Sequence, residues 1–331
     1  MRGVILSPVA GRIAFAIGVL LCLIPLFPAA KPIQPWVAPG ALVFGILVAL
    51  TLTNPYPALS KKISKTGLQA AVVLLGFSVD LNTILNAGRE GIVFALVSII
   101  CVFLLGWGLQ KLLKVRPLTS LLVSTGTAIC GGSAIAAMST VTDAPQEDVS
   151  VAVGTVFLLN ALALIIFPPL GHYLNLTPAQ FGTWSGIAIH DVASVVGAAT
   201  SFGGNSLDTA SAVKLSRVLY LIPIVLIAGY FVRKNREEKG APTPVPWFIG
   251  LFLLTSLLSS YIPFVHDHVA PVARPLATAG FALALFVIGL GITLKTLKAV
   301  GPRPLIQGAL LWIFISVAAL AAVKGMGKTQ N

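Results

Sequence analysis

Long apolar runs, separated by short polar or proline-containing segments, make up most of the chain. Most of the runs approach the roughly 20 residues that a helix needs to cross a bilayer. The runs are continuous and do not alternate residue by residue, which argues against a transmembrane β-barrel. The pattern therefore predicts an all-α polytopic membrane protein, a single membrane domain with about 11 transmembrane helices. The expected spans are residues 12–27, 40–52, 66–79, 91–109, 118–141, 149–170, 181–201, 213–232, 245–262, 276–294 and 305–323.

Composition supports this assignment. Of 331 residues, 56% are hydrophobic and 10% are charged, whereas a soluble domain has about 25% charged residues. An ordinary soluble enzyme and a nucleic-acid-binding domain are therefore excluded, and the chain has no room for a soluble nucleotide-binding domain. The three cysteines all lie inside apolar runs, and the four histidines form no HExxH-type pattern. We accordingly expect no disulfide framework, metal site or cofactor.

Lys and Arg concentrate in alternate connecting segments, which predicts the orientation of the chain. Basic residues gather in segments 61–65, 111–116, 233–239 and 295–303. By the positive-inside rule these segments are cytoplasmic, which puts the N-terminus in the cytoplasm and the C-terminus outside. Residues 143–148 are acidic and contain no Lys or Arg. In this arrangement they are expected outside.

Two short segments hint at an internal repeat. Residues 76–84 (GFSVDLNTI) resemble residues 289–297 (GLGITLKTL), and they belong to the third and tenth runs. These runs are expected to cross in opposite directions. Such a pair predicts an inverted repeat, the architecture of many secondary transporters.

Helix-weakening clusters lie within three runs: TGTAICGGSAIAA at 125–137, GIAIHDVAS at 186–194 and GLG at 289–291. Irregular backbone at membrane depth is tolerated only where it is buried or lines a cavity. A helix break exposes N–H groups that bind anions, so we expect discontinuous helices crossing at mid-membrane. The alternative is close helix packing through small residues. The fifth and seventh runs are expected to run in the same direction, so they cannot be inverted counterparts, whereas the fifth and tenth runs can.

Ionisable residues inside a membrane are candidates for function. His190 and Asp191 lie in the middle of the seventh run, where they are candidates for a proton or cation site. Lys214 and Arg217 share one face of the eighth run because they are three residues apart. Either cation could contact an anion or pair with Asp191, and Lys214 could instead extend to the outer surface. Asn160, in the sixth run, could line the site or bond between helices.

Other polar residues have simpler explanations. Asp80 ends the third run and is expected at the membrane interface. Glu147 and Asp148 are expected to favour the first turn of the sixth helix through its dipole. His266 and His268 are expected in a loop.

Three motifs closely resemble those of the YeiH family of bacterial inner-membrane proteins, a family named for sulfate export. They are GTAICGGSAIAA at 126–137, IHDVA at 189–193 and VKLSR at 213–217, and the ending GLGITL at 289–294 with GPRP at 301–304 is also similar. The resemblance covers nearly the whole chain and keeps the motif order. It implies a multi-pass protein of the bacterial inner membrane. Residues 192–195 (VASV) depart from a glutamine common in that family, which leaves the substrate open.

A more distant resemblance, in CGGS at 130–133 and GLGITL at 289–294, is to bile-acid/sodium symporter-like proteins. It implies paired broken helices that cross at mid-membrane, and a core that moves against a panel of helices.

The sequence thus favours a secondary active transporter of a small anion, such as sulfate, sulfite or a sulfonate, by alternating access. Alternatives are a Na⁺-coupled organic-anion symporter, a channel and an intramembrane enzyme, and we expect no catalytic residues. Expected partners are the anion, H⁺ or Na⁺ as coupling ion, and membrane lipids, but no nucleic acid; a homodimer is one assembly open to the chain. The expected substrate-binding residues are Thr127, Cys130, Gly131, Gly132, Ser133, Lys214 and Arg217, and the expected coupling-ion residues are His190, Asp191 and Asn160.

Overall fold

The protein is an all-α membrane protein. The computed structural model describes residues 8–30, 32–52, 54–78, 81–218, 220–221, 223–224, 227–228 and 247–326, and these contain helices and turns but no strand. Six helices of the described chain are long and apolar enough to cross a membrane. They are Val9–Leu26, Gln34–Thr51, Phe94–Leu113, Glu147–Tyr173, Val265–Gly291 and Pro302–Gly325.

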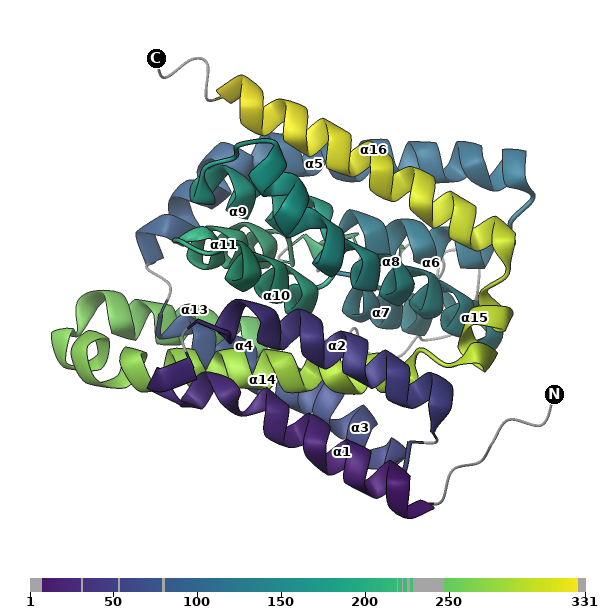
Figure 1. Ribbon diagram of the computed structural model, residues 1–331. Helices are drawn as coiled ribbons and strands as arrows, with labels where there is room; N and C mark the ends of the chain where they lie inside the picture. Colours follow the sequence, from purple (N-terminus) through teal and green to yellow (C-terminus); the bar gives the residue numbers. More distant parts are fainter. Residues whose placement is uncertain are drawn as a thin grey trace.

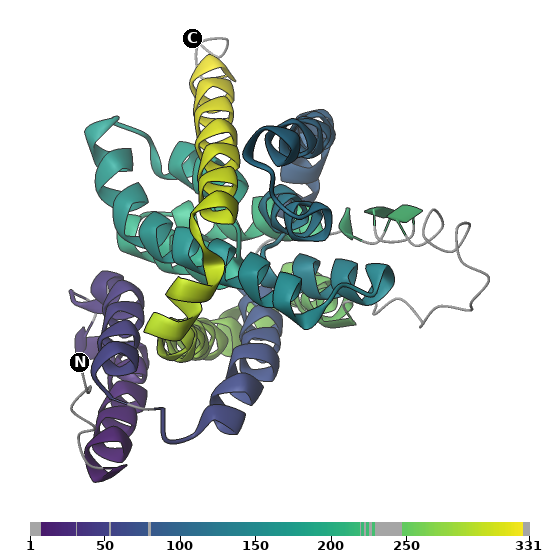
Figure 2. The same ribbon diagram turned by 90° about the vertical axis from the view of Figure 1, so that its right-hand side faces the viewer.

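The helices form two layers, which Figures 1 and 2 show from two directions. The lower layer in Figure 1, which we call the panel, has α14 packed against α2, α4 and α1, and α13 packed against α4. Short helical turns join these helices at their ends. The panel consists of α1 (Pro8–Cys22), η1 (Ile24–Leu26), η2 (Pro28–Ala30), α2 (Gln34–Thr51), α3 (Pro57–Lys62), η3 (Ile63–Gly67), α4 (Leu68–Gly76), α13 (Trp247–Tyr261), η4 (Val265–Val269) and α14 (Ala270–Gly291).

The upper layer, which we call the core, is built around two helix pairs that the long helices enclose. Within it, α16 packs against α5, α6, α8 and α9, and α11 packs against α5 and α9. The core consists of α5 (Leu81–Leu113), α6 (Pro117–Ala128), α7 (Gly132–Thr142), α8 (Gln146–Tyr173), α9 (Pro178–Ala188), α10 (Val192–Phe202), α11 (Ser206–Val218), α15 (Leu294–Val300) and α16 (Pro302–Met326).

Helices α6 and α7 form a hairpin, which we call hairpin A. Arg116 precedes α6, and its Nη1 atom lies 2.9 Å from Oε2 of Glu147, in the first turn of α8. The hydroxyl of Thr119 donates to Asp148, so the start of α6 and the start of α8 lie together. Because Glu147 accepts a hydrogen bond from Arg116, it raises the pKa of the Arg116 guanidinium. The chain therefore enters and leaves hairpin A at the same end of the molecule.

Helices α9 and α10 form a second hairpin, hairpin B, at the other end of the core (Figure 1). Phe181 in α9 stacks on Phe202 at the end of α10, with ring centroids 4.0 Å apart. A Cβ atom on Gly204 would lie 2.7 Å from Cγ of Pro178, the first residue of α9. A proline at N1 and a capping box between Thr177 and Gln180 fix where α9 begins.

The two hairpins differ from the sequence expectation in one consistent way. Segments 118–141 and 181–201 were expected to cross the membrane in the same direction, but each folds back on itself. The acidic segment 143–148, expected on the opposite side from Arg116, instead lies beside it, since Glu147 and Asp148 both form ion pairs with Arg116. Hydropathy cannot separate these cases, because two apolar half-helices have the same composition whether they are collinear or folded back.

The glycine-rich segment 289–291 also differs from expectation, because α14 is continuous through Gly291 and the chain bends only afterwards. A Cβ atom on Gly289 would lie 2.5 Å from the carbonyl oxygen of Leu42 in α2. Gly289 therefore allows close packing of two helices. Gly76 does the same in α4, where a Cβ atom would lie 2.6 Å from the carbonyl oxygen of Phe252 in α13.

Candidate functional site

The turns of the two hairpins meet in the interior of the core. We call residues 129–131 tip A and residues 189–191 tip B. A Cβ atom on Gly131 would lie 3.2 Å from the Cβ atom of Asp191, so the two tips are in direct contact. Gly131 has a φ of 67°, a conformation that glycine adopts at no steric cost. Backbone freedom and space both require glycine at this position.

The helices that leave the two tips begin differently. Asp191 is the N-cap of α10, and its carboxylate accepts hydrogen bonds from the backbone N–H and the hydroxyl of Ser194, both at 2.8 Å. Gly131, the N-cap of α7, has no side chain and forms no such cap. The negative charge of Asp191 therefore offsets the positive end of one helix dipole, while no cap residue offsets the other.

Two polar side chains lie at the uncapped start of α7. The Cys130 sulfur is 2.9 Å from the Ser133 hydroxyl oxygen. Cys130 is buried, whereas Ser133 is exposed and Gly132 is half-buried. The first turn of α7 thus presents backbone and the Ser133 hydroxyl at a point that can be reached from outside the core, with the buried thiol of Cys130 beneath them.

Lys214 lies inside the core, with no exposed surface. Its Nζ atom donates to the carbonyl oxygen of Ile189, at 2.5 Å, where α9 ends. The extension of Lys214 to the surface, one of the sequence alternatives, is therefore wrong. Its ammonium offsets the negative end of the α9 dipole.

Arg217, one turn further along α11, joins three elements. Its Nη1 atom donates to the carbonyl oxygen of Ile187 in α9 at 2.9 Å. Its Nη2 atom donates to the carbonyl oxygen of Ala128 in α6 at 2.7 Å and to the hydroxyl of Ser98 in α5 at 3.3 Å. These helix-end carbonyls and the Ser98 hydroxyl, and not Asp191, are its hydrogen-bond acceptors. The guanidinium therefore ties together the C-terminal ends of the entering helices of both hairpins.

Several buried polar atoms near the tips have no hydrogen-bond partner in the described part of the chain. Asn160 accepts from the backbone N–H of His190 at 3.1 Å, but its Nδ2 donor is unpaired. Both ring nitrogens of His190, the hydroxyl of Thr127 and Nε of Arg217 are also unpaired. Such groups are costly unless water or a ligand satisfies them.

The two helices that leave the tips also differ in exposure. Along α10, residues 192–199 are all buried. Along α7, whose residues are all described, Ser133, Ala136 and Thr140 are exposed and no large apolar side chain is. Helices such as α1, α5 and α16 instead expose large apolar side chains. The exposed face of α7 is therefore small and partly polar, unlike a surface covered by lipid.

The structure thus brings together all ten residues singled out as site candidates, around the two tips and the adjoining parts of α8 and α11. Sequence inspection missed Ser98 and Ser194, because an isolated serine in an apolar helix carries no signal of its own. Among the remaining polar residues, Glu147 and Asp148 lie in the first turn of α8 as expected. His266 and His268 lie in the short helical turn η4, and Asp80 lies outside the described residues.

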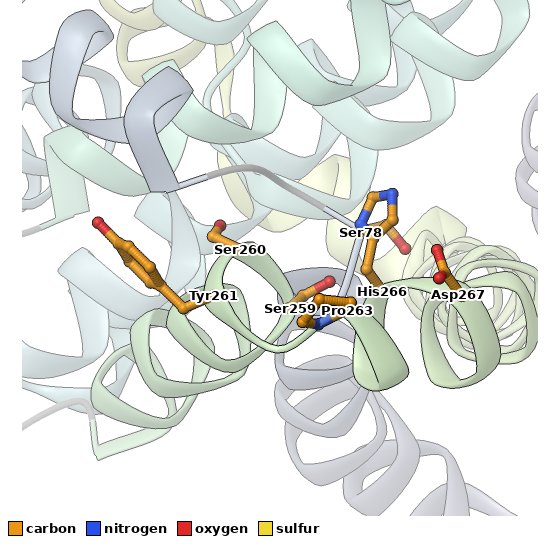
Figure 3. Close-up of a pocket in the computed structure, with 7 residues that line it drawn as sticks. All are labelled: Ser78, Ser259, Ser260, Tyr261, Pro263, His266 and Asp267. Carbon is orange, nitrogen blue, oxygen red and sulfur yellow. The ribbon is translucent and has the colours of Figure 1, made fainter.

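A separate cavity of about 370 Å³ opens where α4 and α13 end (Figure 3). It contains none of the candidate residues. It belongs to the panel, away from the hairpin tips. Its lining residues are Ser78, Ser259, Ser260, Tyr261, Pro263, His266 and Asp267.

Comparison with known proteins gives the family. A family model described as "Conserved hypothetical protein 698" matches residues 13–308. A UPF0324 membrane protein of Porphyromonas gingivalis is 45% identical over 297 residues, 88% of each chain. Others, from Bacteroides thetaiotaomicron and Bdellovibrio bacteriovorus, are both 41% identical, over 89% and 94% of each chain respectively. No solved structure matches the chain. The chain belongs to the UPF0324 family of membrane proteins, the YeiH family.

Proposed function

We propose that this protein is a secondary active transporter of a small anion, which binds where the two hairpin tips meet. The observation that carries the proposal is the charge at this point. Two buried cations, Lys214 and Arg217, and one buried carboxylate, Asp191, lie around the tips, which leaves one formal positive charge in the interior. An unbalanced buried charge is unfavourable, and a bound anion would balance it.

The available donors favour an oxyanion such as sulfate, sulfite or a sulfonate. The uncapped first turn of α7 offers backbone N–H groups, and helix N-termini bind such anions. Ser133 adds a hydroxyl, and the unpaired Nδ2 of Asn160 and Nε of Arg217 are donors without acceptors.

An inverted repeat is part of the proposal, and the hairpins support it first. Helices α7 (Gly132–Thr142) and α10 (Val192–Phe202) both have 11 residues and follow tips at corresponding positions. The hairpins enter the core from opposite ends, so they can be inverted counterparts. This replaces the pairing of the fifth run with the tenth that the sequence suggested.

The panel supports the repeat a second time. Gly289 in α14 meets the carbonyl oxygen of Leu42, and Gly76 in α4 meets that of Phe252. Gly45, three residues after Leu42, approaches the carbonyl oxygen of Phe286. Thr255, three residues after Phe252, donates its hydroxyl to the carbonyl oxygen of Val73 at 2.9 Å. Phe286 and Val73 each lie three residues before the glycine of their own helix. The pair α2 and α14 is thus the counterpart of the pair α13 and α4.

We further propose that the protein lies in the bacterial inner membrane with the basic segments in the cytoplasm. Arg116 lies at the same end as the first turn of α8, and Val300 of α15 packs against Gly154 of that helix. The basic segments 111–116 and 295–303 therefore share one end, as the positive-inside rule requires. Helix α1 begins near this end and α16 finishes at the other (Figure 1), which supports opposite locations for the termini.

For the coupling ion we propose H⁺ or Na⁺ acting through tip B. Asp191 is the carboxylate at the tips, and His190 beside it has two unpaired ring nitrogens. Protonation or cation binding here would change the charge opposite the anion. This would link the two binding events.

The test is an anion screen on the purified protein. A ligand that binds only the folded state raises its melting temperature. At constant ionic strength, sulfate, sulfite or taurine should raise the melting temperature in a saturable way, and chloride should not. Ser133→Ala should weaken this effect. Ser139→Ala, on the same helix but away from the tip, should not. Equal responses of both variants, or no response of the wild type to any oxyanion, would contradict the proposal.

A further inference from the structure

Hairpins A and B are similar in construction but lie in different surroundings. Helix α10 packs against α2 and α14 of the panel as well as against α8. Its counterpart α7 packs against α6 and α8, and among the described residues it makes no comparable contact with α4 or α13. Yet α4 and α13 are the counterparts of α14 and α2. Hairpin B therefore packs against α2 and α14 of the panel, whereas the described residues of hairpin A lack the corresponding contact with α13 and α4.

We propose that the structure is one of two states, and that in the second state α7 packs against α4 and α13 as α10 now packs against α14 and α2. The contact between α10 and the panel would open in the same movement. This rests on the proposed function, since alternating access in a transporter with inverted repeats moves one repeat or bundle against the other. The present state exposes the start of α7, on the side of the basic segments.

The small exposed face of α7 supports this reading. Ala136 and Ser133 are exposed, whereas their counterparts Val196 and Ala193 are buried. A face made of small residues can pack closely against another helix. A helix face that contacts only lipid would carry large apolar side chains like those on α1. The face of α7 thus has the composition of a packing surface without a packing partner in this state.

The repeat identifies the contacts expected in the second state. A Cβ atom on Gly197 of α10 would lie 3.2 Å from Cβ of Ala38 and 3.1 Å from Cδ1 of Leu285. The counterpart of Gly197 is Ala137, since each lies six residues after its N-cap. Ala38 lies four residues before Leu42, so its counterpart is Phe248, four residues before Phe252. Leu285 lies four residues before Gly289, and its counterpart is Val72.

Disulfide cross-linking tests the exchange. Cys22 and Cys101 are replaced by Ala, and the buried Cys130 is kept. One variant has cysteines at positions 38 and 197, where the Cβ separation of 3.2 Å needs to widen by only a few tenths of an ångström to reach that of a disulfide, and it should lock the state described here. A second, with cysteines at 137 and 248, should lock the other state. A third, at 137 and 72, serves if the change at Phe248 prevents folding. Each single-cysteine variant is the control.

A further substitution, Ala136→Cys, reports the state through an impermeant thiol reagent. We expect both kinds of disulfide to form in proteoliposomes and to reverse with reductant. The thiol at position 136 should react about tenfold faster in the 38–197 lock than in the 137–248 or 137–72 lock, since each lock shifts the population. The proposal is overturned if neither 137–248 nor 137–72 forms where 38–197 does, if 38–197 fails to form, or if the thiol at position 136 reacts equally in all locks.

The cross-links need no substrate, so they separate the two proposals. If both states can be locked but no anion raises the melting temperature, anion transport is wrong while the exchange stands. If anions bind but only the 38–197 lock forms, the exchange is wrong while the anion site stands.

Discussion

The ammonium nitrogen of Lys214 lies 2.5 Å from the carbonyl oxygen of Ile189, so a cation on α11 closes the end of a half-helix in hairpin B. The same cation supplies half of the positive charge at the tips. Lys214 therefore combines a structural contact with an electrostatic role. Replacing Lys214 should therefore show the structural and the electrostatic effects separately.

Lys214→Met removes a buried charge and leaves one helix-end carbonyl without a partner. An unpaired buried acceptor costs about 1–3 kcal/mol, and loss of the buried ammonium offsets part of that cost. We expect a small change in melting temperature but about a tenfold or greater loss of oxyanion affinity, because the tips lose their excess positive charge. Titration of sulfate by thermal shift measures both. Lys111→Met, which removes an exposed cation, should change neither, and an unaltered affinity in Lys214→Met would exclude Lys214 from the site.

Arg217→Met tests the structural role of a cation that the sequence alone offered as a contact for an anion or a partner of Asp191. Two helix-end carbonyls, of Ile187 and Ala128, would lose their donor. At about 1–3 kcal/mol each, we expect a loss of about 2–6 kcal/mol in stability and a clearly lower melting temperature. Arg217→Lys should recover part of it, because an ammonium cannot reach both carbonyls in the geometry of a guanidinium. A melting temperature equal to the wild type in Arg217→Met would contradict the structural role.

The glycines of tip A should not be equally sensitive. Gly131→Ala combines a positive φ with a Cβ contact at 3.2 Å to Asp191, and backbone strain alone costs about 1–3 kcal/mol. Gly132→Ala meets the ring of Phe157 at 3.1 Å, and a side-chain ring can shift. We therefore expect a much larger fall in melting temperature for Gly131→Ala. Gly291→Ala has open space around it and is the control; equal effects at 131 and 132 would contradict the geometry of the tip.

Hairpin A makes a prediction about sidedness that a membrane-crossing segment does not. Single cysteines that replace Lys114 and Glu147 should react with an impermeant thiol reagent from the same side of the membrane. In intact cells both should be protected, and in inverted vesicles both should react. Reaction of the two positions from opposite sides would contradict hairpin A and support the eleven-span arrangement expected from the sequence.

The sequence indicated the class of fold and the residues of the candidate site for physical reasons. Charges and glycine clusters inside apolar runs are costly, so they mark candidate positions such as Asp191 and Gly131. The family resemblance was also confirmed. These signals depend on the residue type at single positions, which can be read directly from the sequence.

The direction in which each segment runs through the membrane was harder to predict from the sequence. Whether residues 118–141 cross or fold back depends on contacts such as that between Arg116 and Glu147, which join distant segments. The role of Gly289 likewise depends on the α2 backbone beside it. The acceptors of Arg217 were not foreseeable, because helix-end carbonyls have no sequence signature and an acidic partner is the natural expectation.

Counterflow in proteoliposomes tests the central claim most directly. Vesicles preloaded with unlabelled sulfate, sulfite or taurine are diluted into a trace of the same labelled anion. A carrier should accumulate label transiently and saturably, and the Lys214→Met variant should lose this exchange at substrate concentrations where the wild type is half-saturated. Uptake of label that does not depend on internal anion would indicate a channel. No exchange of any oxyanion by the folded wild-type protein, with either a proton or a sodium gradient, would contradict the assignment as an anion transporter.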